Sequence, residues 1–140
     1  MSARSSGKRR SLCPISVALE MVGDAWSLLI VRDLMFRGRK TFNDFLGGEE
    51  AIASNILADR LARLEDNGIL TKRRDKDDAR RFVYRLTAKG IDLAPMLVEM
   101  VQWSARHEET AAPPQVLRAM RRDRDGFVAR IRAEWAAGDK

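Results

Sequence analysis

The sequence predicts a mainly α-helical protein with one small β-ribbon, and three observations support this fold class. Apolar residues recur every three or four positions along several segments, which is the spacing of one buried helix face. The segment RFVYRL at 81–86 instead alternates between two sets of side chains, which is typical of a strand. Glycine and proline separate these runs, so the chain is expected to form several short elements.

Length and composition limit the class of protein. The chain has 140 residues, the usual size of one domain, and 45% of them are apolar, which is enough for a core. A net charge of +6 and a pI near 10.1 favour a negatively charged partner: nucleic acid, an anionic membrane surface or an acidic protein. No run reaches the roughly 18 apolar residues of a membrane span. Pro14 and Glu20 interrupt the stretch that an export signal needs, so a cytoplasmic protein without a membrane partner is expected.

The N-terminal part is expected to form a tail and two helices. Residues 1–10 are small, polar and basic, which predicts a disordered tail. Pro14 opens a short helix, and Gly23 ends it because glycine tolerates a left-handed cap. Asp24 is placed to cap the next helix, which Gly38 stops. The buried stripe of that helix is expected to be Trp26, Leu29, Ile30 and Leu34.

A short helix, a turn and a longer helix follow. Thr41 and Asp44 predict a capping box at the start of the short helix. GGEE at 47–50 predicts a turn, Ser54 is expected to cap the longer helix, and Asn-Gly at 67–68 ends it. The core face of the longer helix is expected to carry Leu57, Leu61 and Leu64. This order of elements is a helix-turn-helix.

Two strand-like runs, at 69–74 and 81–86, come directly after the helix-turn-helix. The segment between them is long for a tight hairpin and normal for a projecting loop. The charged residues of this region are Lys72, Arg73, Arg74, Lys76, Arg80 and Arg81, together with Asp75, Asp77 and Asp78. A charged hairpin after a helix-turn-helix makes a winged helix, so the predicted fold is a winged helix-turn-helix.

The C-terminal part is expected to be helical and to mediate dimerisation. Thr87 predicts a long helix to about residue 109, kinked at Pro95 because proline lacks a backbone donor. Its apolar residues form two faces, Leu93, Leu97 and Met100 on one and Ala94, Val98 and Val101 on the other. One core covers only one face, so the other is expected to lie in a two-fold homodimer interface.

A break at 111–114 precedes a further apolar stripe, which fits one bent helix or two. The stripe consists of Leu117, Met120, Phe127, Val128, Ile131 and Trp135. The chain is therefore expected to comprise a tail at 1–10, a winged-helix domain with dimerisation helices at 11–110, and a C-terminal helical extension at 111–140.

The second helix of the helix-turn-helix has a surface that suits a DNA major groove, because its outer face is polar or small and arginines flank it. Its candidate DNA-binding residues are Ser54, Asn55, Asp59, Arg60 and Arg63. An ordinary amphipathic helix on a protein surface has a similar pattern, so the helix alone leaves both interpretations open.

Arg80 and Arg81 are the candidate DNA contacts of the hairpin loop. A wing lies beside the recognition helix, and arginine suits a narrow minor groove. The three loop acids repel phosphate, so they are expected to brace the arginines or to face away. The alternative is a solvated loop.

Several motifs, in order along residues 12–105, together resemble one family. They are Cys13-Pro14, Gly23-Asp24-Ala25-Trp26, TFNDFL at 41–46, IASNILADRLARLEDNGIL at 52–70, YRLTAKG at 84–90, and Trp103. This set resembles the HxlR family of winged-helix transcriptional regulators, which are relatives of MarR-type proteins. The resemblance implies a homodimer that binds a palindromic operator in double-stranded DNA, with terminal helices forming the dimer interface. Two departures are the loop DKDDARR at 75–81, which is more similar to a MarR wing, and residues 113–140, which extend past the family's core.

Cys13 matches the position at which some HxlR-type regulators carry a cysteine that senses oxidants or electrophiles. The basic tail and the start of a helix would both favour its thiolate. The alternative is a small packing residue at the dimer interface. The resemblance therefore implies an oxidant or small-molecule inducer only on the first interpretation.

The sequence disfavours an enzyme. It contains no nucleophile–base pair, metal-ligand cluster or glycine-rich phosphate loop, and it has one cysteine and one histidine, His107. No catalytic residue, metal or cofactor is expected. The remaining rival is a winged-helix protein–protein interaction module that does not bind DNA, although such modules usually lack a basic reading face.

Overall fold

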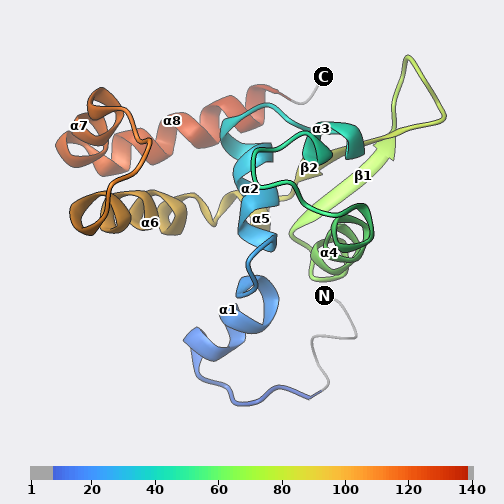
Figure 1. The fold of residues 1–140 in the computed structure, drawn as a ribbon, viewed down its shortest axis with the longest axis horizontal. Helices are drawn as coiled ribbons and strands as arrows, with labels where there is room; N and C mark the ends of the chain where they lie inside the picture. Colours follow the sequence, from blue (N-terminus) through green and yellow to red (C-terminus); the bar gives the residue numbers. More distant parts are fainter. Residues whose placement is uncertain (1–7, 139–140) are drawn as a thin grey trace. The chain divides into compact units, whose positions relative to one another are not determined.

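The computed structural model describes residues 8–138 (Figure 1). Most of the tail predicted at 1–10 therefore lies outside the described residues. The chain divides into two compact units, of which the first ends at Gly90 and the second begins at Ile91.

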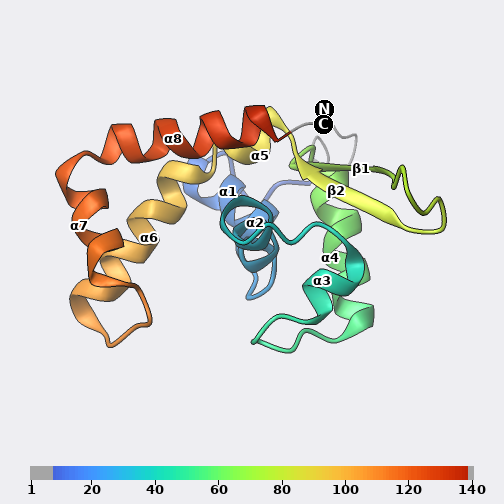
Figure 2. The same cartoon turned by 90° about the horizontal axis from the view of Figure 1, so that it is seen from above.

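The first unit contains short helices and one two-stranded sheet. Its elements are α1 (Pro14–Val22), α2 (Ser27–Phe36), α3 (Phe42–Leu46), α4 (Ser54–Asp66), β1 (Leu70–Arg74) and β2 (Phe82–Leu86), followed by α5 (Ala88–Ile91) at the junction of the units. The strands pair antiparallel, with Leu70 opposite Leu86 and Arg74 opposite Phe82. Figure 2 shows the loop of this ribbon projecting past α3 and α4. The predicted mainly α fold with a small ribbon, a winged helix-turn-helix, is confirmed.

Apolar side chains on the inner face of α4 and on both faces of β2 are buried. Leu57, Leu61 and Leu64 of α4 are buried, as their spacing predicts. In β2, Val83 is buried beside Tyr84, so the strand is covered on both sides. The stripe predicted for α2 is correct only in part. Ile30 and Val31 are its buried apolar residues, whereas Trp26, Leu29 and Leu34 are half-buried.

One of the predicted helix caps is confirmed, and the predicted cap at Asp24 is displaced from the helix start. The Thr41 hydroxyl accepts from the Asp44 backbone N–H while the Asp44 carboxylate accepts from the Thr41 N–H, which completes the capping box. The N-cap of α2 is Trp26, not Asp24, but the Asp24 carboxylate, two residues earlier, accepts from the N–H of Ser27 at the start of the helix.

Two other caps differ from the prediction. Ala53, with an extended backbone, is the N-cap of α4, so Ser54 is already helical and makes no side-chain cap. Gly23 ends α1 with φ −83°, which is not left-handed. Its requirement for glycine is steric instead, because a Cβ there would lie 2.4 Å from the Leu19 carbonyl oxygen.

The second unit consists of α6 (Ala94–His107), α7 (Pro114–Arg122) and α8 (Arg124–Ala137). The single long helix predicted from Thr87 is wrong. Thr87 instead caps the short α5, because its hydroxyl accepts from the Gly90 N–H. Pro95 lies in the first turn of α6, where the N–H that proline lacks would have no helical partner. The stripe beyond residue 114 belongs to two helices, because Asp123 ends α7 and caps α8. Its buried members are Met120, Val128 and Ile131.

Within the described residues, no single helix is long and apolar enough to cross a membrane. Only α1 and α2 taken together reach that length and composition, and they are bent by 79°.

Candidate nucleic-acid interface

The exposed face of α4 carries most of the residues that the sequence singled out in this helix. Ser54, Asn55 and Asp59 are exposed, and Asn55 and Asp59 lie opposite the buried leucines. Arg63 is partly exposed and lies 4.0 Å from Asp59, a spacing of one helical turn. A helix with this exposed face can enter a major groove with short polar side chains directed at the bases.

Arg60 is held in place by two carboxylates. Its Nε donates to Asp24 over 2.8 Å, and a second guanidinium nitrogen donates to Asp59. Asp24 also accepts from Ser27 and from the backbone N–H of Trp26. Burial raises the pKa of Asp24, but these hydrogen bonds outweigh it and hold the pKa well below its usual range. Sequence reasoning assigned Asp24 only a capping role and missed its contact with α4.

The turn between α3 and α4 is braced by ion pairs to α2. The Arg32 guanidinium donates to both Glu50 oxygens, at 2.7 and 3.0 Å, and also contacts the buried Asp33. Arg37, just past the end of α2, pairs with Glu49, and its hydrogen bond lowers the pKa of Glu49 to about 2. These contacts fix the turn that precedes α4. Sequence reasoning missed them because the partners are 12 and 18 residues apart.

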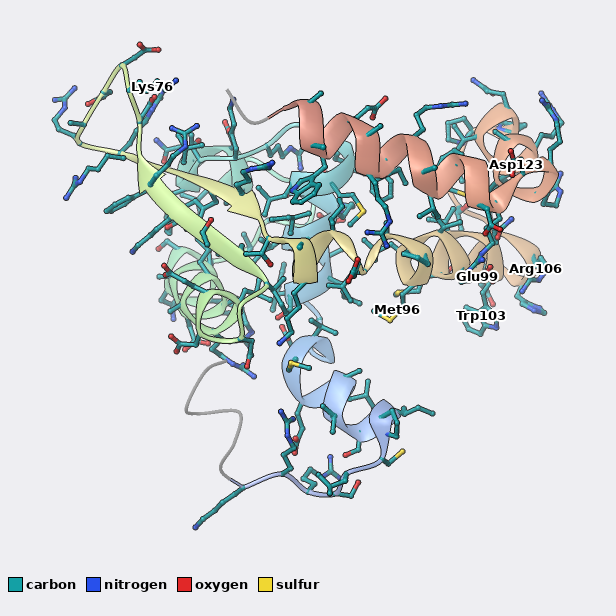
Figure 3. All side chains as sticks on the ribbon, turned by 180° about the vertical axis from the view of Figure 1, so that it is seen from behind. Lys76, Met96, Glu99, Trp103, Arg106 and Asp123 are labelled. Atoms are coloured by element: carbon teal, nitrogen blue, oxygen red, sulfur yellow. The ribbon has the colours of Figure 1, made fainter. Side chains whose placement is uncertain are left out.

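The wing loop holds its arginines against its own acids. Arg81 donates to Asp75, and Arg80 donates through Nε to Asp78 over 3.0 Å. These arginine hydrogen bonds lower the pKa of both carboxyl groups. The expectation that loop acids brace the arginines is thus correct for these two. Figure 3 shows Lys76 at the tip of the loop.

Two cationic side chains lie over the Phe82 ring, where the ribbon meets the wing loop. The Lys72 ammonium lies 4.5 Å from the centre of the Phe82 ring, and the Arg74 guanidinium lies 4.6 Å from it. Such contacts hold both charges on one side of the ribbon.

A hollow of about 280 Å³ separates the wing from α3. It is lined by Thr41, Phe42, Asn43, Arg80, Arg81, Phe82 and Tyr84. The Tyr84 N–H donates to the Lys40 carbonyl over 2.8 Å, which ties β2 to the segment before α3. The structure thereby brings both wing arginines beside the first helix of the helix-turn-helix.

Cys13 is exposed at the N-cap of α1. Hydrogen bonds from the backbone of Ser16 and Ile15 lower the pKa of its thiol. The start of the helix therefore favours the thiolate, as the sequence predicts. Of the basic residues before it, Arg9 is directed to Glu20, at 3.6 Å.

Each unit exposes large apolar side chains. On and beside α1 they are Leu12, Ile15 and Leu19, and on α6 they are Met100 and Trp103, which is 61% exposed. Figure 3 shows Met96 and Trp103 pointing from α6 to the side away from α8. The single chain covers the predicted apolar faces of the C-terminal helix only in part. Ala94, Leu97 and Val98 are buried, whereas Met100 is exposed.

Among residues 8–138, no group of three or more histidine, cysteine, aspartate or glutamate side chains is arranged to hold a metal ion.

Comparison with known proteins identifies the family. The HxlR-like helix-turn-helix family matches residues 21–112, which excludes α7 and α8. The HTH-type transcriptional regulator Rv3095 of Mycobacterium tuberculosis is 35% identical over 102 residues, covering 72% of this chain and 63% of its own length. YodB of Bacillus subtilis, also an HTH-type transcriptional regulator, is 32% identical over 95 residues, covering 67% of this chain and 84% of YodB.

Solved structures give the same result. PA1607 is 35% identical with a TM-score of 0.66, covering 75% of this chain and 72% of that chain. Reduced YodB has a TM-score of 0.58 at 30% identity, covering 69% and 95%. The redox regulator HypR in its oxidized form has a TM-score of 0.61 at 26% identity, covering 70% and 100%. The chain therefore belongs to the HxlR family of winged-helix transcriptional regulators.

Proposed function

We propose that this transcriptional regulator binds a palindromic operator in double-stranded DNA as a homodimer in the cytoplasm. The observation that carries the proposal is the exposed face of α4, with short polar side chains, beside a projecting loop that carries Arg80 and Arg81. A helix for the major groove and an arginine loop for the adjacent groove are the two parts that winged-helix reading of DNA requires.

In this proposal each candidate residue has a distinct part. Asn55 reads a base, because an amide can make two hydrogen bonds to adenine. Ser54 and Asp59 contribute polar groups beside it, and Arg60 and Arg63 flank the reading face. Arg80 and Arg81 contact the backbone or the minor groove.

The exposed apolar side chains support the proposed homodimer. Trp103 and Met100 on α6, and Ile15 and Leu19 on α1, are large apolar residues left in solvent by a single chain. Exposed apolar clusters of this kind mark interaction surfaces. We expect a second copy to cover them, with half-sites about 34–36 Å apart on the DNA. A monomer by light scattering at micromolar concentration, binding DNA one protein per site, would contradict the dimer.

A response to oxidants or electrophiles through Cys13 is a separable part of the proposal. It is supported by the exposure and lowered pKa of this thiol, and by similarity to HypR, a redox regulator, and to YodB, which has been solved bound to quinone. The Cys13→Ser variant is expected to bind DNA normally and to lose its response to peroxide, quinone or aldehyde. An unchanged response in that variant would leave Cys13 with a packing role only.

Recovery of bound fragments from the source genome, at two salt concentrations, tests the central proposal. Specific fragments should be enriched at both, and their affinity should fall steeply as salt rises, because phosphate contacts release counterions. If no fragment is enriched over random DNA, the chain is better explained as an interaction module that does not bind DNA.

A further inference from the structure

One carboxylate of the first unit, that of Asp24, accepts four hydrogen bonds. Asp24 lies between α1 and α2 and accepts from the backbone N–H of Trp26 and Ser27, the Ser27 hydroxyl and Arg60. The first three contacts stabilise the start of α2. The fourth reaches across 36 residues to the recognition helix, and capping does not require it.

The fourth contact is directional and partly shielded from solvent. The Nε of Arg60 lies 2.8 Å from Asp24, and each side chain is only 22% exposed. A charged hydrogen bond in such a position is stronger than one in open solvent. On its other side the same guanidinium donates to Asp59, which belongs to the proposed reading face. A chain of contacts therefore runs from the α1–α2 junction to that face.

The apolar core sets which face of α4 is buried. Leu57, Leu61 and Leu64 fix how deeply the helix is buried, but leucine contacts are not directional. Base reading requires side chains to be held within about 0.5 Å and 10–20° of the productive geometry. A hydrogen-bonded ion pair on the flank of the helix adds a directional constraint on rotation about its axis.

We propose that Asp24 is a positioning residue for DNA recognition, which sets the orientation of α4 through Arg60. The proposal rests on the proposed function, because it assumes that α4 reads operator DNA. It also changes the part played by Arg60, whose Nε serves to orient the helix and is not free for a phosphate.

Opposite charge changes make the proposal testable. Asp24→Asn keeps an acceptor for the α2 cap, since asparagine caps about as well as aspartate, but it removes the negative charge that holds Arg60. Arg60→Met removes the other partner and keeps a long side chain. By net charge alone, Asp24→Asn should strengthen DNA binding and Arg60→Met should weaken it. If the pair positions α4, both variants should weaken operator binding.

The measurement compares the affinity of the full chain for an operator fragment and for a random duplex of equal length. Each single variant is expected to lose at least about fivefold in operator affinity, in the range seen for coupled neighbours in double-mutant cycles. The double variant should lose no more operator affinity than the more affected single variant. The Asp24→Asn variant should bind the random duplex at least as well as wild type. Arg63→Met, whose carboxylate partner is 4.0 Å away, is the matched control and should add to Asp24→Asn independently.

Melting temperatures separate positioning from loss of the fold. Binding is measured well below the melting temperature of each variant, and Asp24→Ser, which also keeps a capping oxygen, replaces Asp24→Asn if that variant melts too early. Unchanged or tighter operator binding by Asp24→Asn, or additive losses in the double variant, would overturn the inference. If wild type itself does not prefer the operator, the proposed function fails together with this inference, and that result differs from a failure of Asp24 alone.

Discussion

Replacing Arg80 and Arg81 together with alanine tests whether the wing contacts DNA. The Arg80 side chain is 91% exposed and that of Arg81 is 57% exposed, and each faces a single carboxylate of the same loop. Exposed ion pairs contribute little to stability, and the ribbon is anchored by the buried Val83 and Tyr84. The melting temperature is therefore expected to stay nearly unchanged.

The effect on DNA binding follows from counterion release. Each lost phosphate contact lowers the magnitude of the log–log salt slope by about 0.9, so loss of both lowers it by about 1.8. Over a fourfold rise in salt, wild type should then lose about twelvefold more affinity than the double variant. At low salt, the double variant should also bind more weakly than the two lost phosphate contacts alone predict, because Asp75 and Asp78 would remain beside the phosphates without their arginines.

Fluorescence anisotropy on an operator with A·T-rich or G·C-rich flanks measures both effects. A minor-groove contact predicts a larger loss on A·T-rich flanks, where the groove is narrow. Replacement of both residues by lysine should keep the salt slope and lose this flank preference, because lysine keeps the charge without the planar fork. The control is Arg121→Ala with Arg122→Ala, an equal charge change at exposed positions of α7. Unchanged affinity and slope in the wing variant, or an equal change in the control, would refute a wing contact.

Three further predictions concern the reading helix, the core and acid stability. Asn55→Ala should relax base preference at one position per half-site, by about 1–3 kcal/mol of discrimination in a sequence-preference assay; an unchanged preference would mean that another residue reads that base. Gly90→Ala should lower the free energy of unfolding by about 3 kcal/mol in urea, because its Cβ would lie 2.1 Å from the Ile69 carbonyl oxygen, whereas Gly47→Ala, with 3.5 Å to its nearest atom, should be tolerated. The lowered pKa of Asp24 gives stability that is complete above its unfolded value near 3.8 and is lost as pH falls further. Wild type should thus lose more in melting temperature than Asp24→Asn between about pH 4.5 and about pH 2.5, and parallel curves would count against the pairing.

Sequence pattern predicted the features that depend on near neighbours. The two partners of the Thr41–Asp44 capping box are three positions apart, and the leucines of α4 recur every three or four positions, so both follow from helix geometry alone. The helix phase was right for the same reason, since burial of Leu57 and Leu61 leaves Asn55 and Asp59 exposed. The order of helices and strands followed from turn residues and periodicity.

The errors arose where one residue type permits two backbone geometries. Pro95 was expected to kink a helix, but it begins one, because proline is compatible with both positions and only the break after α5 decides between them. Ser54 was expected to cap α4, but the extended residue is Ala53, and serine also occurs inside a first turn. Such choices depend on where the preceding turn ends. For α4 that turn includes Ala51 at φ 59°, a left-handed conformation that an alanine rarely signals in sequence.

The sequence did not reveal how α4 is held against the rest of the first unit. The contacts that brace the turn and the flank of α4 join residues 12, 18 and 36 positions apart, through Arg37, Arg32 and Arg60. From the sequence alone, each of these arginines would be counted as a positive charge available to DNA. In the structure, each is paired with a carboxylate of the first unit. The arginines of the first unit therefore differ in exposure: Arg32 and Arg60 are shielded beside their carboxylates, whereas Arg80 remains 91% exposed although it pairs with Asp78. Substitution of a shielded arginine that orients α4, such as Arg60, should reduce the preference for operator over random duplex, and substitution of an exposed arginine such as Arg80 should change how steeply binding depends on salt.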